Sequence, residues 1–400
     1  MTWEGVFTQI INDSHLVTGD DLSAMTDQAV RPLGLNAEVL AVDLAQAALS
    51  PVQPEPGTPV AVEGTLAGRA YQLGEIVPGR ERGGRVLWVP ILDGTDRVGV
   101  LRIGLSPGVV DDGPFRRRCW ALSGLLGHIL ISKVPYSERL RWIRGGVSLS
   151  PAAEMTWQLV PPRTFATERL VVTALLEPWD TVAGDAYDYA VNAGDAFFAV
   201  FDGVGHDLQA GQDTALAITA IRLARRQGIT DLPTLAAHAD DLLLTQPGPA
   251  QFVTAVLATL DTATGALHYV LAGHPPPLLV RRGRAIKELG HPPRTPLGVR
   301  ELPLDRVTVG HEQLEPGDRL LLYSDGITEA RNADGEFFGE QRLVDLTRRA
   351  ELAGLPAPET LRRLRAAVLA HQGGRLQDDA TLVLVDWAAD ASRNLFPALP

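Results

Sequence analysis

Apolar residues in the first quarter of the chain recur at spacings that predict both helices and strands. Residues 6–33 carry apolar side chains at helical spacing in two pieces, separated near Gly19 and Asp20. A proline-rich stretch at residues 51–59 predicts a loop. Two later segments flank a turn of Asp, Gly, Thr and Asp, which indicates a hairpin. We therefore predict an α/β module over about the first 107 residues, with strands at residues 37–44, 86–92 and 97–105.

The next segment predicts a helical linker. Residues 115–134 and 137–160 follow a helical pattern and are interrupted by Pro135. The glycine pair at residues 145–146 predicts that the second helix is broken or hinged. We assign residues 133–166 to this linker. It has two interpretations, a parallel helix pair in a homodimer or a spacer folded onto a neighbour, and its heptad pattern is too short to choose between them.

From about residue 170 the pattern changes to short apolar strands in runs, with helices grouped between the runs. This order favours an α+β domain, which we place at residues 167–390, over strict βαβ alternation. The predicted strands are residues 170–177, 196–201, 252–261, 267–272, 278–282, 319–324 and 381–386. The predicted helices are residues 208–227, 232–245, 341–352 and 358–371.

Composition and charge narrow the class of protein. The chain has 400 residues, enough for two or three domains, and a net charge of −12. An acidic balance argues against a nucleic-acid or anionic-membrane surface, which needs clustered Lys and Arg. The one cysteine, Cys119, excludes an intrachain disulfide, and its apolar neighbours indicate a buried, inert thiol. Because no signal-peptide pattern is present and the most apolar segment, residues 120–134, is too short to span a bilayer, we expect a cytoplasmic protein.

Acidic residues stand at the ends of several apolar segments. Asp202 precedes Gly203 at the end of one predicted strand, and Asp325 follows another. Asp185 and Asp378 stand next to further apolar segments. One strand-ending Asp-Gly pair is commonly a turn, but several rigid carboxylates that converge make the oxygen cage that Mg²⁺ or Mn²⁺ needs. The ordered set predicts a metal-dependent enzyme.

Short sequence words around these acids carry a family resemblance. They are, in order, VAGDAYDY (182–189), FDGVGH (201–206), FVTA (252–255), AGHPPP (272–277), PLG (296–298), PGD (316–318), YSDGITEA (323–330) and DDAT (378–381). As an ordered set they resemble the metal-dependent protein phosphatases (PPM, type 2C), and within them the bacterial SpoIIE/RsbU-like branch. Two positions depart from the family pattern, Ala183 and Asp207, where the family often has glycine.

The resemblance implies a central β-sandwich flanked by helices (αββα) and two Mn²⁺ or Mg²⁺ ions at one end of it. Asp202 would bridge both metals, and the Gly203 carbonyl would bind one of them. Asp325 and Asp378 would hold the other metal, while Asp185 would contribute directly or through a water. Two metals about 3.5–4 Å apart can activate a bridging water for in-line attack on a phosphoryl group. These five residues are our predicted metal ligands, and the four aspartates among them are also our predicted catalytic residues.

Several neighbouring residues have two interpretations. We read Asp207 as the N-cap of the helix that begins at residue 208, with metal contact as the alternative. We read Asp379 as a supporting or solvent-facing partner of Asp378, although the two could exchange roles. His206 is read as a hydrogen-bonded loop residue, with proton relay as the alternative. His274 is read as a structural residue of a turn.

Two further predictions concern residues outside this set. Asp188 is predicted to cap a turn. The arginines Arg222, Arg225 and Arg226 fall on one face of a predicted helix, where we expect solvation. The sequence therefore offers no clear phosphate-binding arginine.

The N-terminal module carries a looser resemblance. The words are GRAY (68–71), WVPIL (88–92) and VGVLRIG (98–104). They resemble the GAF sensor domains, which implies a GAF-like α/β sensor at residues 1–132 with an unknown ligand. A PAS-type sensor and a purely structural domain are the alternatives.

Taken together, the resemblances imply a serine/threonine phosphoprotein phosphatase gated by an N-terminal sensor. The branch commonly acts on anti-sigma-factor antagonists, so a phosphorylated regulatory protein of that type is the implied substrate. A catalytically inactive, partner-binding scaffold is the alternative, although such a scaffold would be expected to lack at least one of the acids. A dehalogenase-type hydrolase is a weaker reading, because Asp202 is not followed two residues later by a second aspartate.

Overall fold

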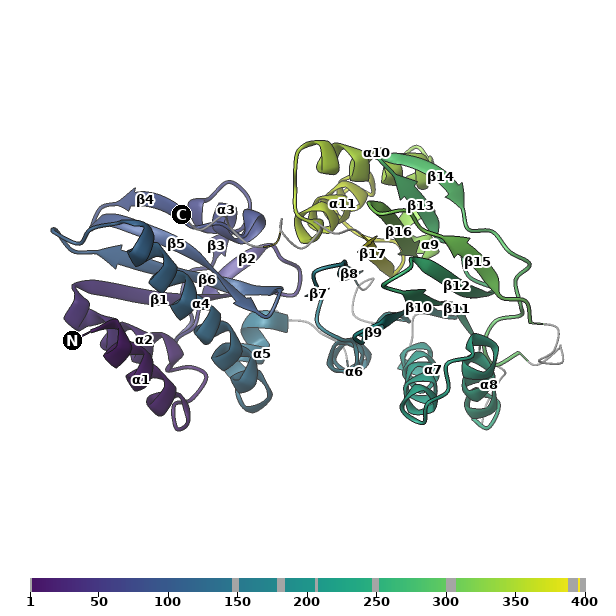
Figure 1. The fold of residues 1–400 in the computed structure, drawn as a ribbon, viewed down its shortest axis with the longest axis horizontal. Helices are drawn as coiled ribbons and strands as arrows, with labels where there is room; N and C mark the ends of the chain where they lie inside the picture. The colour runs from purple at the N-terminus through teal and green to yellow at the C-terminus, as the bar shows by residue number, and fades with distance from the viewer. Residues whose placement is uncertain are drawn as a thin grey trace. The chain divides into compact units, whose positions relative to one another are not determined.

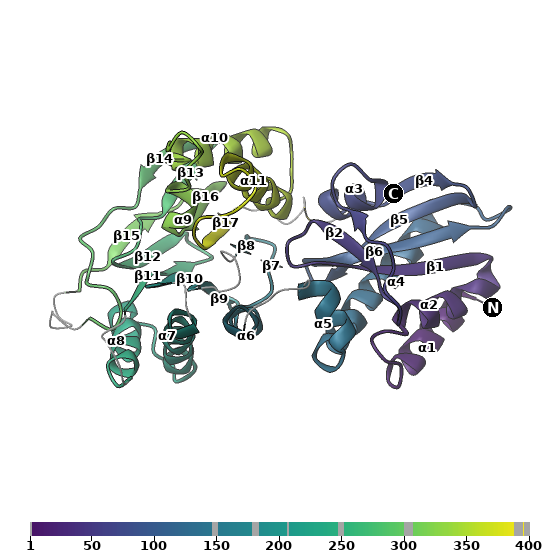
Figure 2. The same ribbon diagram turned by 180° about the vertical axis from the view of Figure 1, so that it is seen from behind.

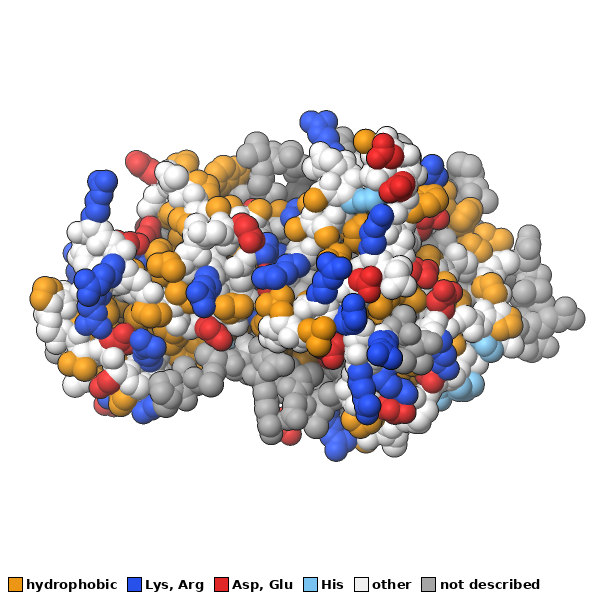
Figure 3. All heavy atoms as spheres, turned by 90° about the horizontal axis from the view of Figure 1, so that it is seen from above, with side chains coloured by type: hydrophobic (Ala, Val, Ile, Leu, Met, Phe, Trp, Pro, Cys, Tyr) orange, Lys and Arg blue, Asp and Glu red, His pale blue; other side chains and the backbone are white. Residues whose placement is uncertain are grey.

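The structure is a computed structural model, and contacts divide it into two units. Residues 1–148 and 393–400 form the N-terminal unit, and residues 149–392 form the C-terminal unit. On the face drawn in Figure 3, Lys and Arg side chains are interspersed with Asp and Glu side chains over each unit.

The structure describes residues 2–145, 151–177, 184–205, 208–246, 252–299, 307–387 and 395.

The N-terminal unit is built on a six-stranded antiparallel sheet with the strand order β3-β2-β1-β6-β5-β4 (Figure 1). Its elements are α1 (Trp3–Ser14), α2 (Leu22–Val30), η1 (Arg31–Leu33), β1 (Leu35–Val42), β2 (Ala48–Pro51), β3 (Val60–Ala61), α3 (Leu66–Leu73), β4 (Val77–Glu81), β5 (Gly84–Asp93), β6 (Asp96–Leu105), α4 (Gly113–Lys133), η2 (Val134–Tyr136) and α5 (Glu138–Gly145).

Helices cover both faces of this sheet because its strands are apolar on both sides. Val6 of α1 and Leu126 of α4 are fully buried with Leu101 of β6 in one core. On the opposite face, Tyr71 of α3 packs with Trp88 of β5 in a second core. Burial of each such side chain stabilises the fold by about 1.5–3 kcal/mol. The strands are therefore fixed from both sides.

The sequence predictions for this unit agree closely with the structure. The two N-terminal helices, the first strand and the hairpin are confirmed, and Gly94 supplies the left-handed turn conformation (φ 59°) between β5 and β6. The break at Pro135 is confirmed as the 3₁₀ turn η2. The elements β2, β3, α3 and β4 were not predicted, and Pro51, in the stretch expected to be a loop, is the last residue of β2 and is paired with Leu40.

The C-terminal unit contains two antiparallel sheets, of orders β15-β12-β11-β10-β9 and β14-β13-β16-β17-β8-β7. Its elements are α6 (Pro151–Leu159), β7 (Thr164–Ala166), β8 (Leu170–Glu177), β9 (Asp185–Val191), β10 (Asp195–Gly203), α7 (Leu208–Arg226), α8 (Leu232–Leu243), β11 (Val253–Asp261), β12 (Ala266–Ala272), β13 (Leu278–Arg281), β14 (Arg284–Glu288), β15 (Gly310–Gln313), β16 (Asp318–Tyr323), α9 (Asp325–Thr328), α10 (Gly339–Leu352), α11 (Ala357–His371) and β17 (Ala380–Trp387).

The two sheets face each other, and helices cover their outer faces (Figure 1). Alternating residues of β10 explain this layering, because Phe198 and Val200 point into the core between the sheets, while Phe197 and Phe201 pack toward α7 and α8. Seen from behind, α7 and α8 still lie on one side of the sandwich and α10 and α11 on the other (Figure 2). The unit is therefore an α+β sandwich with helical outer layers.

Strong apolar patterns were predicted well in this unit, and weak ones were missed. The four predicted helices and seven predicted strands are confirmed to within about two residues at each end. Strand β9 was missed because its sequence, DAYDYAV, contains two aspartates. It forms because it pairs along β10 from Asp202↔Asp185 to Ala196↔Val191. Within the described ranges, no helix combines the length and apolar content needed to cross a bilayer.

Candidate metal centre

In the C-terminal unit, the five-stranded sheet β15-β12-β11-β10-β9, called the first sheet below, brings together two of the predicted acids at one end of its strands. Asp185 begins β9 and lies directly opposite Asp202, near the end of β10. Thr254 of β11 is the partner of Asp202 on its other side. Asp185 is buried, at 2% exposure, while Asp202 is partly exposed. The predicted pair therefore stands on neighbouring strands at one end of the sandwich.

The second sheet of this unit, β14-β13-β16-β17-β8-β7, also brings two predicted acids together, next to the ends of its neighbouring strands β16 and β17. Asp325 is the first residue of α9, two residues after the end of β16, and Asp378 lies two residues before β17, which pairs with β16. Gly326 permits this approach, because a Cβ there would lie 1.9 Å from the carbonyl oxygen of Asp379. Only glycine fits this contact without a backbone shift.

Asp379 ties the two sheets together. Its Oδ2 accepts hydrogen bonds from the backbone N–H groups of Gly184 at 2.6 Å and Asp185 at 3.3 Å. Its own N–H donates to Asp378 Oδ1 at 2.9 Å. The expected partnership with Asp378 is confirmed, but a solvent-facing position is wrong, since Asp379 is 5% exposed. The sequence did not indicate the link from Asp379 to the strand that begins at Asp185.

Helix α7 packs closely on the same end of the first sheet. Thr214 donates a hydrogen bond to the Gly184 carbonyl at 2.6 Å, and the Gly203 N–H donates to the same carbonyl at 3.1 Å. A Cβ on Gly203 would lie 2.6 Å from Thr214 Oγ1 and 2.8 Å from the Ala210 carbonyl. Glycine at 203 is therefore required by packing, in addition to the metal role predicted for its carbonyl.

The electrostatics show that these acids are close enough to repel one another. Burial, and then the charges of Asp325, Asp378 and Asp379, raise the pKa of Asp202 to about 7. Burial, and then the charges of Asp202 and Asp379, raise the pKa of Asp185 well above its ordinary value. Asp185 Oδ2 is also buried without a hydrogen-bond partner. An accumulation of desolvated negative charge is stabilised by a bound cation.

The donor set fits hard divalent cations in its chemistry. It consists of carboxylates and a backbone carbonyl, the oxygen ligands that Mg²⁺ and Mn²⁺ prefer. The unpartnered Oδ2 of Asp185 is free to accept such an ion. Within the described ranges, however, no group of three or more His, Cys, Asp or Glu side chains is gathered tightly enough to hold a metal ion. The metal assignments of Asp185, Asp202, Gly203, Asp325 and Asp378 therefore remain predictions.

A buried histidine connects the acid-bearing ends of the two sheets. His274 is 5% exposed, and burial lowers its pKa to about 4, so it is neutral. Its Nε2 lies 3.1 Å from the Tyr323 carbonyl, which only accepts, so Nε2 carries the proton. Nδ1 therefore accepts a hydrogen bond from the Thr254 hydroxyl at 2.8 Å. Because the hydroxyl has a single proton, it donates no hydrogen bond to Asp202 Oδ2, which lies 3.5 Å away. The structural role predicted for His274 is confirmed.

Two predictions about charged residues need correction. Asp188 does not cap a turn. It is buried within β9, at 1% exposure, and pairs with Arg222 at 2.7 Å and Arg225 at 2.6 Å. These two arginines are therefore held against the sheet, and only Arg226 is exposed as expected. The residues Ala183, His206 and Asp207 lie outside the described residues.

A second buried ion pair was not visible in the sequence. Arg294, at 8% exposure, donates to both carboxylate oxygens of Asp240 on α8, at 2.9 and 2.8 Å. Asp240 also accepts the Gly298 N–H at 2.9 Å. These contacts anchor the PLG word to α8, while Leu297 pairs with Val253. Nothing in the local sequence around Asp240 signals this long-range contact.

Comparison with known proteins identifies the domain. Residues 192–388 match the family described as Stage II sporulation protein E (SpoIIE). The C-terminal half of this chain is a SpoIIE/PP2C-type phosphatase domain. Domains of this type are protein serine/threonine phosphatases that use divalent metal ions. The matched residues include Asp202, Gly203, Asp325 and Asp378, whereas Asp185 lies before the match.

Individual relatives of the SpoIIE-type domain cover only part of the chain. Protein IcfG of Synechocystis sp. is 27% identical over 243 residues, which are 54% of this chain and 37% of the relative. This chain therefore spans well under two thirds of that relative's length. The solved RsbU and RsbW domains of Rv1364c from Mycobacterium tuberculosis are 26% identical, with 57% of this chain and 62% of that chain covered and a TM-score of 0.48. The phosphatase domain and regulatory fragment of SpoIIE from Bacillus subtilis are 23% identical, with 55% and 63% covered and a TM-score of 0.45.

Proposed function

We propose that this chain is a metal-dependent phosphatase that removes phosphate from serine or threonine of a phosphorylated regulatory protein. One observation carries the proposal: both sheets of a SpoIIE-type domain bring acids to the same end of the sandwich. There, burial and then the charges of Asp325, Asp378 and Asp379 raise the pKa of Asp202. Structural acids are normally paired with cations, whereas this group repels itself.

The roles of the residues follow from their positions. Asp202 and the Gly203 carbonyl would hold one ion, and Asp325 and Asp378 the other, with Asp202 shared and Asp185 beside it. Two Mn²⁺ or Mg²⁺ ions at these oxygens supply Lewis acidity toward a water and toward the phosphoryl oxygens.

The surrounding groups keep these oxygens in place and available. Asp379 holds the backbone of Gly184 and Asp185. His274 Nδ1 accepts the hydrogen bond of the Thr254 hydroxyl, so that hydroxyl does not compete for the Asp202 carboxylate. The one thiol of the sequence, Cys119, is fully buried in the N-terminal unit, and burial raises its pKa to about 12, so it is unsuited to nucleophilic attack.

The substrate and the gating are part of the same proposal. The RsbU-like resemblance supports an anti-sigma-factor antagonist as the phosphoprotein. The N-terminal unit would act as a GAF-like sensor for an unknown ligand, and its α/β architecture of one sheet covered by helices is compatible with that role. The linker helices would support a homodimer.

A catalytically inactive scaffold is the competing function. It is favoured by one observation, that the described acids are not gathered into a ready-made metal cage. It is opposed by the presence of all of the predicted acidic ligands, Asp185, Asp202, Asp325 and Asp378.

The test measures hydrolysis of para-nitrophenyl phosphate by the full chain with Mn²⁺, beside Asp202→Asn. A matched control is Asp195→Asn, which changes an exposed aspartate at the other end of β10. We expect turnover in the wild type and the control, and a loss of about 10³-fold or more in Asp202→Asn. Turnover that survives in Asp202→Asn would refute the metal assignment. No turnover together with no calorimetric Mn²⁺ binding would establish the scaffold.

A further inference from the structure

A hollow of about 810 Å³ opens in the C-terminal unit on the outer face of the first sheet. Strands β9 to β12, the last turn of α7 and the start of α8 line it. Its volume lies within the roughly 300–1,000 Å³ typical of small-molecule sites. It does not include the predicted metal ligands, although Asp188, which lines it, lies three residues along β9 from Asp185 (188 − 185 = 3), about 10 Å at the usual rise per residue.

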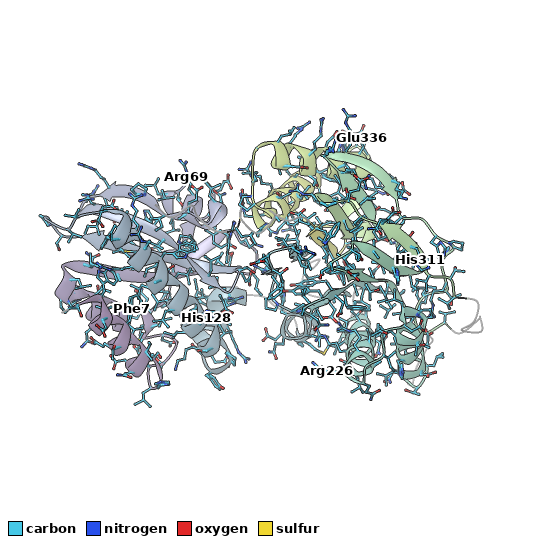
Figure 4. All side chains as sticks on the ribbon, viewed as in Figure 1. Phe7, Arg69, His128, Arg226, His311 and Glu336 are labelled. Atoms are coloured by element: carbon cyan, nitrogen blue, oxygen red, sulfur yellow. The ribbon has the colours of Figure 1, made fainter. Side chains whose placement is uncertain are left out.

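Three arginines of α7 form one wall of this hollow. Arg222 and Arg225 are paired with the buried Asp188, and the Arg225 guanidinium lies 4.0 Å from the centre of the Phe197 ring. Arg225 Nε is buried without a hydrogen-bond partner. Arg226 is exposed and lies on the helical layer beneath the sheet in the view of Figure 4. Three positive charges less that of Asp188 leave two positive charges along this wall, while Asp195 and Asp261 elsewhere in the lining bring the hollow as a whole to three Arg and three Asp.

The opposite wall has a different chemistry. It carries oxygen acceptors from the β9–β10 and β11–β12 turns, notably Asp195 and Asp261. Asp195 accepts a hydrogen bond from the Asn192 amide at 3.0 Å, and Asp261 accepts from backbone N–H groups of its turn, so both carboxylates have fixed positions. Such acceptors suit hydroxyl or amino groups of a ligand. Apolar side chains, Ile229 and Leu235 among them, also line the hollow.

We propose that this hollow, the arginine pocket, binds an organic phosphate. A phosphate monoester carries up to two negative charges, which the arginine wall attracts, and guanidinium groups bind phosphate oxygens with good geometry. The hydroxyl- or amine-bearing remainder of the molecule extends over Phe197 toward Asp195 and Asp261. Inorganic phosphate alone fills only a small part of the volume. This site is independent of the proposed phosphatase chemistry, since none of the predicted metal ligands lines it.

Calorimetric titration of the full chain in EDTA tests the proposal, because EDTA removes phosphate binding that depends on metals. The probes are adenosine 5′-monophosphate, ribose 5-phosphate and glycerol 3-phosphate, with adenosine and inorganic phosphate as comparisons. We expect at least one of the three esters to bind about tenfold more tightly than adenosine and inorganic phosphate. Failure of all three esters to bind at about 10 mM, or equal binding of inorganic phosphate, overturns the proposal.

Substitutions locate the binding. Arg226→Ala removes an exposed guanidinium and should weaken the best ester about tenfold. Arg349→Ala removes an exposed arginine of α10 that does not line the pocket, and it should bind like the wild type. Asp202→Asn, at the metal centre, should also leave binding unchanged. Wild-type affinity in Arg226→Ala, or an equal loss in Arg349→Ala, overturns the assignment.

Discussion

Replacement of Asp188 by asparagine tests how much the buried ion pairs of the first sheet contribute to stability. The variant keeps the shape of the side chain and removes the charge that faces Arg222 and Arg225. Removing one partner of a buried ion pair costs about 3–5 kcal/mol, because the remaining charge is left desolvated. The two arginine side chains are 19% and 18% exposed, so water partly compensates them. We therefore expect a loss near the lower limit, about 3 kcal/mol.

This loss converts into a measurable shift in melting temperature. The C-terminal unit spans residues 149–392, a size at which 1 kcal/mol corresponds to about 2–4 °C. Asp188→Asn should lower the melting temperature of this unit by about 6–12 °C in scanning calorimetry of the metal-free chain. The control Asp195→Asn, at an exposed position on the neighbouring strand, should shift it by less than about 2 °C. A shift for Asp188→Asn no larger than that of the control would refute this reasoning.

Three further predictions concern the metal centre. Burial lowers the pKa of His274 to about 4 from an ordinary 6.5, so its neutral form stabilises the fold above pH 6.5 and that contribution is lost as the pH falls toward 4. Between pH 7 and pH 5, urea titrations should show the wild type losing about 2 kcal/mol more than His274→Gln, and equal losses would contradict the neutral buried histidine. The pKa of Asp202 is raised to about 7, so the metal-free fold loses stability as the pH rises from about 4 to 7, and Asp202→Asn should be about 1–3 kcal/mol more stable than the wild type at pH 8. A less stable Asp202→Asn would show that the carboxylate is not repelled there. In Gly326→Ala the new Cβ meets the Asp379 carbonyl, so we expect a loss of about 2–4 kcal/mol together with weaker Mn²⁺ binding, whereas Gly194→Ala, which has open space around it, should retain both.

The sequence predicted those parts of the fold in which local pattern and tertiary packing agree. Residues 170–177 are apolar except for Thr173 and Glu177, and they form β8 with the predicted limits because they are buried on both faces. Strand β9 has no such pattern, since its aspartates at 185 and 188 disguise it. It exists because β10 supplies a hydrogen-bonding partner along its whole length. Local propensity carries no information about that partner.

The difference between local pattern and tertiary contact also explains which residues of the candidate site could be predicted from the sequence. The order of acids at the ends of apolar segments predicted which carboxylates lie together, because strand ends of a sandwich share an edge. The contacts of Asp188 could not be predicted, because its arginine partners are more than 30 residues away and look solvated in a helical projection. The role of Asp379 was undetermined for a similar reason, since its acceptor position depends on the backbone of Gly184, 195 residues away.

The division of the acids between two sheets has a consequence for unfolding. Asp202 belongs to the first sheet and Asp378 to the edge of the second, so an ion held by both would close a loop of 176 residues (378 − 202 = 176). Such a cross-link restricts the unfolded chain as a disulfide does, and for loops of this length the chain-entropy effect is about 5 kcal/mol. Sliding of one sheet against the other would pull the two ligands apart. Metal binding would then depend on the relative position of the two sheets, and the sheets would separate more readily once the ion is lost.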